Sequence, residues 1–181
     1  MKQNLETTIA LLERTPAALD ALLRGLPKAW VERNEGEGTW NALEIVGHLA
    51  HAEVTDWMPR VQCILDYGES RDFPPFDRTG FWRILEGREL AEVLDEFSRL
   101  RLKNLTELAS LGLQPADMDR TGRHPAFGTV TLSQLLATWA AHDANHLHQL
   151  ARVLAHQYRA AVGPWSAFLG VMSCNGHSER G

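Results

Sequence analysis

Apolar residues recur at three- and four-residue steps in four long stretches of the chain, which predicts four amphipathic helices. The first stretch covers residues 5–23. Pro16 within it predicts either a kink or a helix that restarts with Thr15 as its N-cap. The third stretch covers residues 88–111, and Gly112 is expected to end this helix as its C-cap.

The second helix carries a clear start signal. Asn41 is a candidate N-cap, and Glu44 three residues later completes a capping-box pattern. The helix should continue to residues 67–68. Pro59 lies within this span and is expected to bend it.

A long connection precedes the fourth helix. Residues 114–130 contain prolines and glycines and lack helical periodicity, and connections of this length often border functional sites. The fourth helix should begin at Thr131 or Ser133 and run to about residue 158. No stretch shows strand alternation of useful length, and there is no internal repeat. The pattern therefore predicts an all-α, up-down-type four-helix bundle with short extra helices or loops.

Composition and charge narrow the class of protein. The chain has 181 residues, of which 44% are hydrophobic and 23% charged, as in a soluble globular domain. We expect residues 1–172 to form one domain and residues 173–181 a frayed tail. The net charge of -5 argues against a nucleic-acid partner. No apolar run is long enough for a membrane span and no secretory signal is visible, so the expected compartment is the cytoplasm.

The fourth helix has the most informative spacing. Its inward stripe consists of Leu132, Leu135, Trp139, His142, His146, Leu150 and Val153. Two histidines one turn apart thus take core positions, and imidazoles at this spacing can converge on one metal ion. Buried imidazoles are costly unless their nitrogens have partners. Because such a pair alone is more often structural, a metal site needs a third ligand from another helix.

The second helix offers two candidates for that ligand, His48 and His51. The helix is apolar on most of its circumference, so periodicity does not choose between them. Taken alone, either histidine is more often structural than metal-bound.

Two motifs, at residues 40–49 and 131–150, resemble the DinB-like (DinB/YfiT-like) family of metal-binding four-helix bundles over nearly the whole chain. In that family the histidine of the first motif and two of the second bind a metal ion, often zinc or nickel. The resemblance therefore implies His48, His142 and His146 as ligands and leaves His51 as a neighbour. One relative, mycothiol-dependent maleylpyruvate isomerase, carries a glutamate in place of His142 and a second domain, which argues against that activity here.

Three neutral imidazoles leave an open coordination position, as in catalytic zinc sites. The resemblance implies a metal-dependent transferase that uses a low-molecular-weight thiol and a small-molecule substrate. A metal-dependent hydrolase and a non-enzymatic metal-binding stress-response protein are the alternatives. Bundles of this kind also resemble proteins that commonly form homodimers, which implies a homodimer of this chain.

Most polar residues near the three candidate ligands in the sequence are expected to have structural roles. Gln149 shares the metal-facing side and could position a ligand or bond to another helix. Asp143, one residue off the stripe, is expected to be solvated or bonded across helices. Glu44 is expected to cap its helix or to bond to the free ring nitrogen of His48. His148 and His156 are expected to be surface residues.

Overall fold

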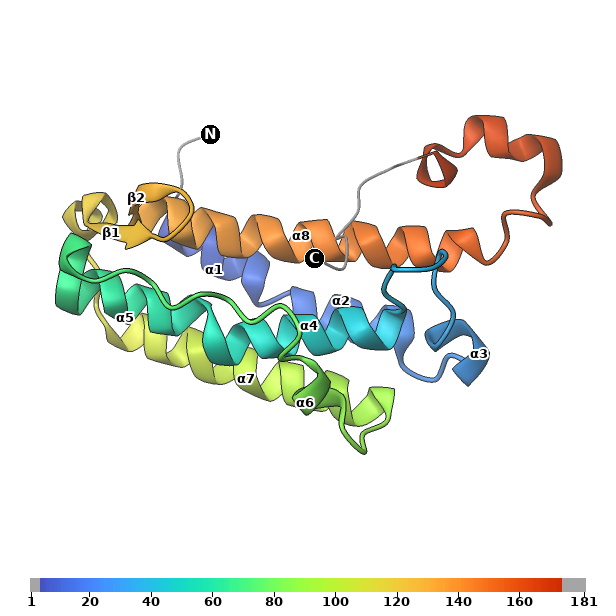
Figure 1. Ribbon diagram of the computed structural model, residues 1–181, viewed down its shortest axis with the longest axis horizontal. Helices are drawn as coiled ribbons and strands as arrows, with labels where there is room; N and C mark the ends of the chain where they lie inside the picture. The colour runs from blue at the N-terminus through green and yellow to red at the C-terminus, as the bar shows by residue number, and fades with distance from the viewer. Residues whose placement is uncertain (1–3, 174–181) are drawn as a thin grey trace.

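The computed structural model describes residues 4–173, which form four helical rods packed side by side (Figure 1). The rods are α1 (Leu5–Leu12) followed by α2 (Thr15–Leu23), α4 (Ala42–Thr55) followed by α5 (Trp57–Tyr67), α7 (Leu90–Ser110), and α8 (Leu132–His156). The predicted all-α four-helix bundle is confirmed. The predicted frayed tail lies outside the described residues, apart from Ser173.

Prolines explain both breaks in the composite rods. A proline lacks the backbone N–H of a helical residue, and its ring clashes with the carbonyl four residues earlier. Pro16 lies four residues after Leu12, the last residue of α1, and Pro59 four residues after Thr55, the last residue of α4. The predicted N-cap Thr15 is wrong by one position, because Arg14 is the N-cap of α2.

Capping boxes fix the starts of α4 and α8. The Asn41 side chain accepts from the Glu44 backbone N–H at 2.9 Å, and the Glu44 carboxylate accepts from the Asn41 backbone N–H at 2.8 Å. Thr131 and Gln134 form the same pair of bonds at 3.1 and 2.8 Å. The N-cap of α8 is therefore Thr131 and not Ser133, the other predicted start. Gly112, at a φ of 57°, follows the C-cap of α7.

The connections contain a small hairpin that the sequence analysis missed. Strand β1 (Thr121–His124) pairs antiparallel with β2 (Gly128–Thr131). Four-residue strands are too short to show a pattern of alternation, which is why residues 114–130 looked structureless. The other short elements are α3 (Lys28–Val31), η1 (Gly68–Ser70), α6 (Trp82–Leu85), η2 (Pro115–Asp119), η3 (Gly163–Phe168) and η4 (Gly170–Met172).

The rods do not simply alternate in direction. The connection from residue 68 to residue 89 returns along the bundle, so α4–α5 and α7 run parallel (Figure 1). Accordingly Arg101 of α7 pairs with Glu53 late in α4, whereas Asp95 near the start of α7 pairs with Arg24 at the end of α2. Helix α8 runs antiparallel to α4 and lies beside it.

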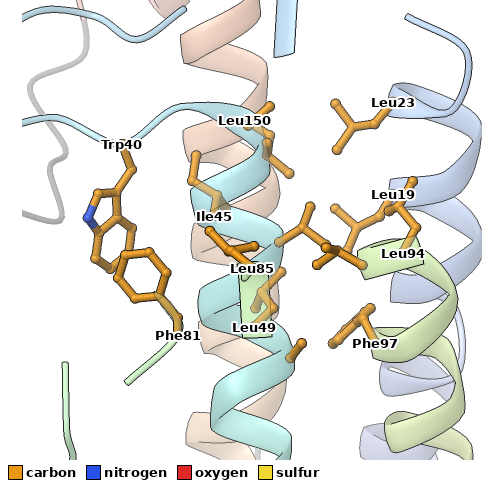
Figure 2. Packing of buried hydrophobic residues seen from close by; sticks show 14 of the residues in the cluster. Leu19, Leu23, Trp40, Ile45, Leu49, Phe81, Leu85, Leu94, Phe97 and Leu150 are labelled. Atoms are coloured by element: carbon orange, nitrogen blue, oxygen red, sulfur yellow. The ribbon is translucent and has the colours of Figure 1, made fainter. Parts of the chain in front are cut away.

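The apolar core is divided into two clusters. One is built around Leu19, Ile45, Leu94 and Phe97 and reaches α8 at Leu150 (Figure 2). The other contains Leu12, Trp57 and Leu105 and extends along the first part of α8 as far as Trp139. Between these two points α8 contributes the buried polar side chains of Asp143, His146 and Gln149. We refer to this part of the interior as the polar layer.

No helix within residues 4–173 is long and apolar enough to cross a membrane. The homodimer stays a prediction, because the structure describes one chain.

Candidate metal centre

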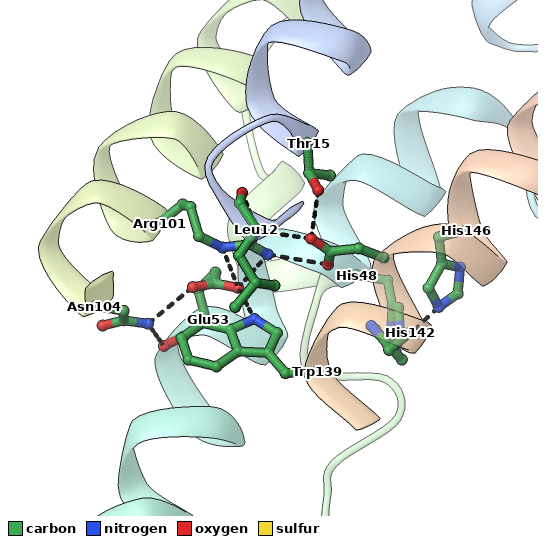
Figure 3. Close-up of polar contacts among 10 residues, drawn as sticks. Leu12, Thr15, His48, Glu53, Arg101, Asn104, Trp139, His142 and His146 are labelled. Atoms are coloured by element: carbon green, nitrogen blue, oxygen red, sulfur yellow. Dashed lines mark hydrogen bonds and ion pairs between the residues drawn. The ribbon is translucent and has the colours of Figure 1, made fainter. Parts of the chain in front are cut away.

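His48 of α4 and His142 and His146 of α8 turn their rings toward one another in the polar layer (Figure 3). The Nε2 atom of His142 lies 3.1 Å from Nε2 of His48 and 3.1 Å from Nε2 of His146. One ring nitrogen of each histidine lies within 4.8 Å of the others. Two nitrogens about 2.1 Å from one ion and about 100° apart would be about 3.2 Å from each other, so this spacing fits a single ion.

Burial keeps these imidazoles neutral. His48 and His146 are 7% and 2% exposed, and His142 is half-buried. Burial is the main cause that lowers the pKa of His48 to about 2 and that of His142 to about 3, and repulsion between the imidazolium charges adds to it. The pKa of His146 is lowered mainly by burial as well. Neutral imidazole is the form that binds a metal ion.

One of the three histidines has a partner that orients its ring. The Nδ1–H group of His146 donates to Oε1 of Gln149 at 2.7 Å, one turn further along α8. With the proton on Nδ1, the lone pair of Nε2 is directed at the other two histidines. Gln149 thus positions the ring of a candidate ligand, one of its two predicted roles, and its hydrogen bond lies within α8 rather than between helices. Among the described residues, Nδ1 of His48 and of His142 has no hydrogen-bond partner.

Aromatic side chains form walls around the histidines. The Trp40 ring lies 4.8 Å from that of His48 and stacks on His146 at 6.3 Å. Phe76, from the connection between η1 and α6, meets the His48 ring edge-on at 5.6 Å. Trp57 meets the His142 ring edge-on at 5.2 Å. These rings limit the access of water to the nitrogens and lower the local dielectric constant.

His51 lies on another face of α4 and has a structural role. Its Nε2–H group donates to the backbone carbonyl of Asp77 at 3.0 Å. A Cβ atom on Gly80 would lie 2.4 Å from the His51 ring, so this loop approaches α4 closely enough to require glycine. His51 therefore holds residues 77–80 against α4 and is not one of the three clustered histidines.

A buried ionic network beside the histidines was missed by the sequence analysis. The Arg101 guanidinium is 1% exposed and contacts two carboxylates, Glu53 of α4 and Asp143 of α8, both at most 3% exposed. Burial raises the pKa of Glu53, and Arg101 opposes this shift. Asp143 is bonded across helices as one alternative predicted. The alternative that Asp143 is solvated is wrong, because its carboxylate is buried against the Arg101 guanidinium.

The remaining predicted residues are not part of the cluster of three histidines. Glu44 caps α4 as expected. His148 is exposed, whereas His156 is half-buried rather than a surface residue.

The lowered pKa values predict how stability depends on pH. The unfolded chain takes up protons below a pH of about 6.5, whereas folded His48 and His142 do not until about pH 2 and 3. Metal-free protein should therefore have its full stability above about pH 6.5 and lose it as the pH falls. At pH 5 the loss should be about 2 kcal/mol for each histidine.

Urea unfolding in EDTA at pH 7 and pH 5 measures this loss. The His142→Gln variant should lose about 2 kcal/mol less than the unmodified protein between the two pH values. Equal losses in the two proteins would contradict the lowered pKa of His142.

Comparisons with known proteins agree with this fold. The family model of the DinB superfamily matches residues 11–150. YfiT from Bacillus subtilis, described as a probable metal-dependent hydrolase with an unusual four-helix bundle topology, is 19% identical and superposes with a TM-score of 0.70, covering 87% of each chain. TT2238, a four-helix bundle protein, is 24% identical with a TM-score of 0.54 over 82% of this chain and 98% of its own.

A search of curated proteins found no match. The two solved structures are less than 25% identical to this chain, so they show similarity of fold alone. The family model matches residues 11–150, most of the sequence, and this range includes all three histidines. The chain therefore belongs to the DinB superfamily.

Proposed function

We propose that this protein is a divalent-metal-dependent transferase that uses a low-molecular-weight thiol, with zinc or nickel held by His48, His142 and His146. The observation that carries the proposal is the convergence of three imidazole ring nitrogens, two from buried histidines and one from the half-buried His142. Three protein ligands leave room in the coordination sphere, which distinguishes catalytic from structural zinc sites.

The residues fit such an ion. All three imidazoles are neutral at pH 7 because their pKa values are lowered, and Gln149 orients the ring of His146. A bound divalent ion supplies Lewis acidity, which lowers the pKa of a thiol or water placed on it. Trp40 and Phe76 lie against the ligand rings and would keep bulk water away from the reacting sulfur.

The buried carboxylates favour a thiol over water as the activated group. A hydrolase of the usual kind needs a general base within hydrogen-bond reach of its water. Glu44 is held by its capping box, Asp56 by Arg60, and Glu53 and Asp143 by Arg101. A thiol has a free pKa of about 8.5 and ionises at pH 7 after a small shift, so it needs no separate base.

A metal-dependent hydrolase is the second candidate. The fold resembles that of YfiT, which is described as a probable metal-dependent hydrolase. A non-enzymatic metal-binding protein is the third, since ligand geometry alone does not require turnover.

Cobalt-substituted protein separates these candidates. Titration with N-acetylcysteine at pH 7 is expected to produce a near-ultraviolet thiolate-to-cobalt charge-transfer band, because the metal lowers the pKa of the thiol below 7. N-acetylserine, the matched oxygen compound, should give no such band. Bound cobalt without a band would remove the thiol proposal in favour of the hydrolase or the non-enzymatic protein.

A further inference from the structure

Arg101 connects the two helices that carry the histidines. Its Nε and Nη2 atoms donate to Glu53 Oε1 of α4 at 3.1 and 2.8 Å, and Nη1 and Nη2 donate to Asp143 of α8 at 2.6 and 3.0 Å (Figure 3). A further bond from Nη1 reaches the backbone carbonyl of Leu12 at the end of α1, at 2.8 Å. All three guanidinium nitrogens are therefore engaged.

Further bonds fix both carboxylates. Glu53 accepts from the Trp139 indole at 3.0 Å and from the Asn104 amide at 2.9 Å. Asp143 accepts from the Thr15 hydroxyl at 2.6 Å. The network therefore includes side chains of α2, α4, α7 and α8, and both oxygens of each carboxylate accept hydrogen bonds.

Each carboxylate is carried by a helix that also carries at least one of the three histidines. Asp143 directly follows His142 in α8, and Glu53 lies five residues after His48 in α4. Arg101 belongs to α7, which carries none of the three histidines. The distance between the α4 ligand and the α8 ligands is thus bridged by a side chain of a third helix.

Stability alone is a poor reason for this arrangement. Taking a guanidinium and two carboxylates out of water is costly, and well-packed apolar residues of similar volume often give a protein that is as stable or more stable. The apolar clusters on either side of the polar layer show that this bundle packs leucine and phenylalanine at the same interfaces. What the guanidinium adds is a fixed geometry. Its planar N–H groups can bond to two carboxylates only when the carboxylates lie in a few positions relative to each other.

We propose that Arg101 is a positioning residue of the metal centre, which holds α4 and α8 at the spacing that lets His48 meet His142 and His146. This inference rests on the proposed metal centre. Arg101 acts through Glu53 and Asp143 and does not touch the ion or the substrate.

The test is a triple substitution, Arg101→Met with Glu53→Gln and Asp143→Asn, which removes the three charges together and leaves no buried charge unpaired. Far-UV circular dichroism and a cooperative urea transition should show a folded protein. The dissociation constant for Co²⁺ should rise by at least about tenfold, and the cobalt d–d absorption should change because the ligand geometry is less well defined. An unchanged spectrum with a dissociation constant within about twofold of the unmodified protein would overturn the proposal.

The Arg152–Glu35 pair provides the matched control. Arg152 is also buried in α8 and also makes a charged pair, but Glu35 lies in the loop before α4 and not on a ligand-bearing helix. Arg152→Met with Glu35→Gln should leave the Co²⁺ dissociation constant within about twofold. If this control weakens cobalt binding as much as the triple substitution, lost stability explains both and the positioning role is rejected.

A milder variant covers the case in which the triple substitution does not fold. Arg101→Lys keeps the charge, but one ammonium group cannot bridge both carboxylates as the guanidinium does. Its Co²⁺ dissociation constant should rise by at least about threefold, and a value equal to that of the unmodified protein would overturn the proposal. Failure of the unmodified protein to bind Co²⁺ would instead overturn the metal centre itself.

Discussion

The single substitution Arg101→Met should lower the free energy of unfolding by about 3–5 kcal/mol, because it leaves Glu53 and Asp143 buried without their counter-charge. Domains of this size are stable by about 5–15 kcal/mol, so the variant should be marginally folded at 25 °C. Urea unfolding at pH 7, followed by far-UV circular dichroism, measures the difference. Removing one partner of a buried ionic network costs more stability than replacing the whole network. The triple substitution of Arg101, Glu53 and Asp143 should therefore lower the free energy of unfolding by less than Arg101→Met does.

Arg99 is the control for this measurement. It lies two residues before Arg101 in the same helix and pairs with Glu96 at 2.8 Å, but its side chain is 61% exposed. Arg99→Met should therefore change the free energy of unfolding by less than about 1 kcal/mol. If Arg101→Met and Arg99→Met lower the free energy of unfolding by amounts that agree within about 1 kcal/mol, the buried network contributes no more to stability than a surface ion pair does.

His146→Ala should abolish stoichiometric metal binding and raise the dissociation constant for Zn²⁺ by more than about a hundredfold, because two imidazoles alone make a weak site. The helical content should remain, since the apolar stripes on both sides of the polar layer hold the bundle together. Isothermal titration with Zn²⁺ gives the affinity, and far-UV circular dichroism gives the helical content.

His148 serves as the matched control, because it is an exposed histidine two residues further along α8. His148→Ala should bind one equivalent of Zn²⁺ as the unmodified protein does. A His146→Ala variant that still binds one equivalent with unchanged affinity would remove this histidine from the ligand set. Collapse of the helical signal when EDTA is added to the unmodified protein would show a structural rather than a catalytic ion.

The helices could be predicted well from the sequence because their signals are local. Apolar spacing locates the four rods, and the capping residues Asn41 and Thr131 start α4 and α8. Pro59 was expected to bend a single helix, but the helix is instead broken at Asp56 into α4 and α5. The parallel course of α4 and α7 depends on how the connection after Gly68 packs, which no local pattern reveals.

The candidate site could be predicted only in part. His142 and His146 stand out because they replace apolar residues in a stripe, whereas the preference for His48 over His51 came from the family resemblance and not from periodicity. The contact that distinguishes the two is the hydrogen bond from the His51 ring to the backbone carbonyl of Asp77, in a loop far along the chain. Such a contact is invisible in the sequence.

The ionic network left a signal that could have been found. On α7, Phe97, Arg101, Asn104 and Leu108 follow one another at steps of four, three and four, so two polar residues occupy core positions of the stripe. Polar residues on an apolar stripe need partners from other helices. The identity of those partners, Glu53 and Asp143, required the folded chain.

The most direct test of the metal centre is the crystal structure of Co²⁺-loaded protein, with anomalous diffraction recorded at the cobalt absorption edge. We predict one anomalous peak about 2.0–2.2 Å from the Nε2 atoms of His48, His142 and His146. A peak bound by other residues, such as His51, or the absence of a peak from protein that carries one equivalent of cobalt in solution, would contradict the ligand set and the function built on it.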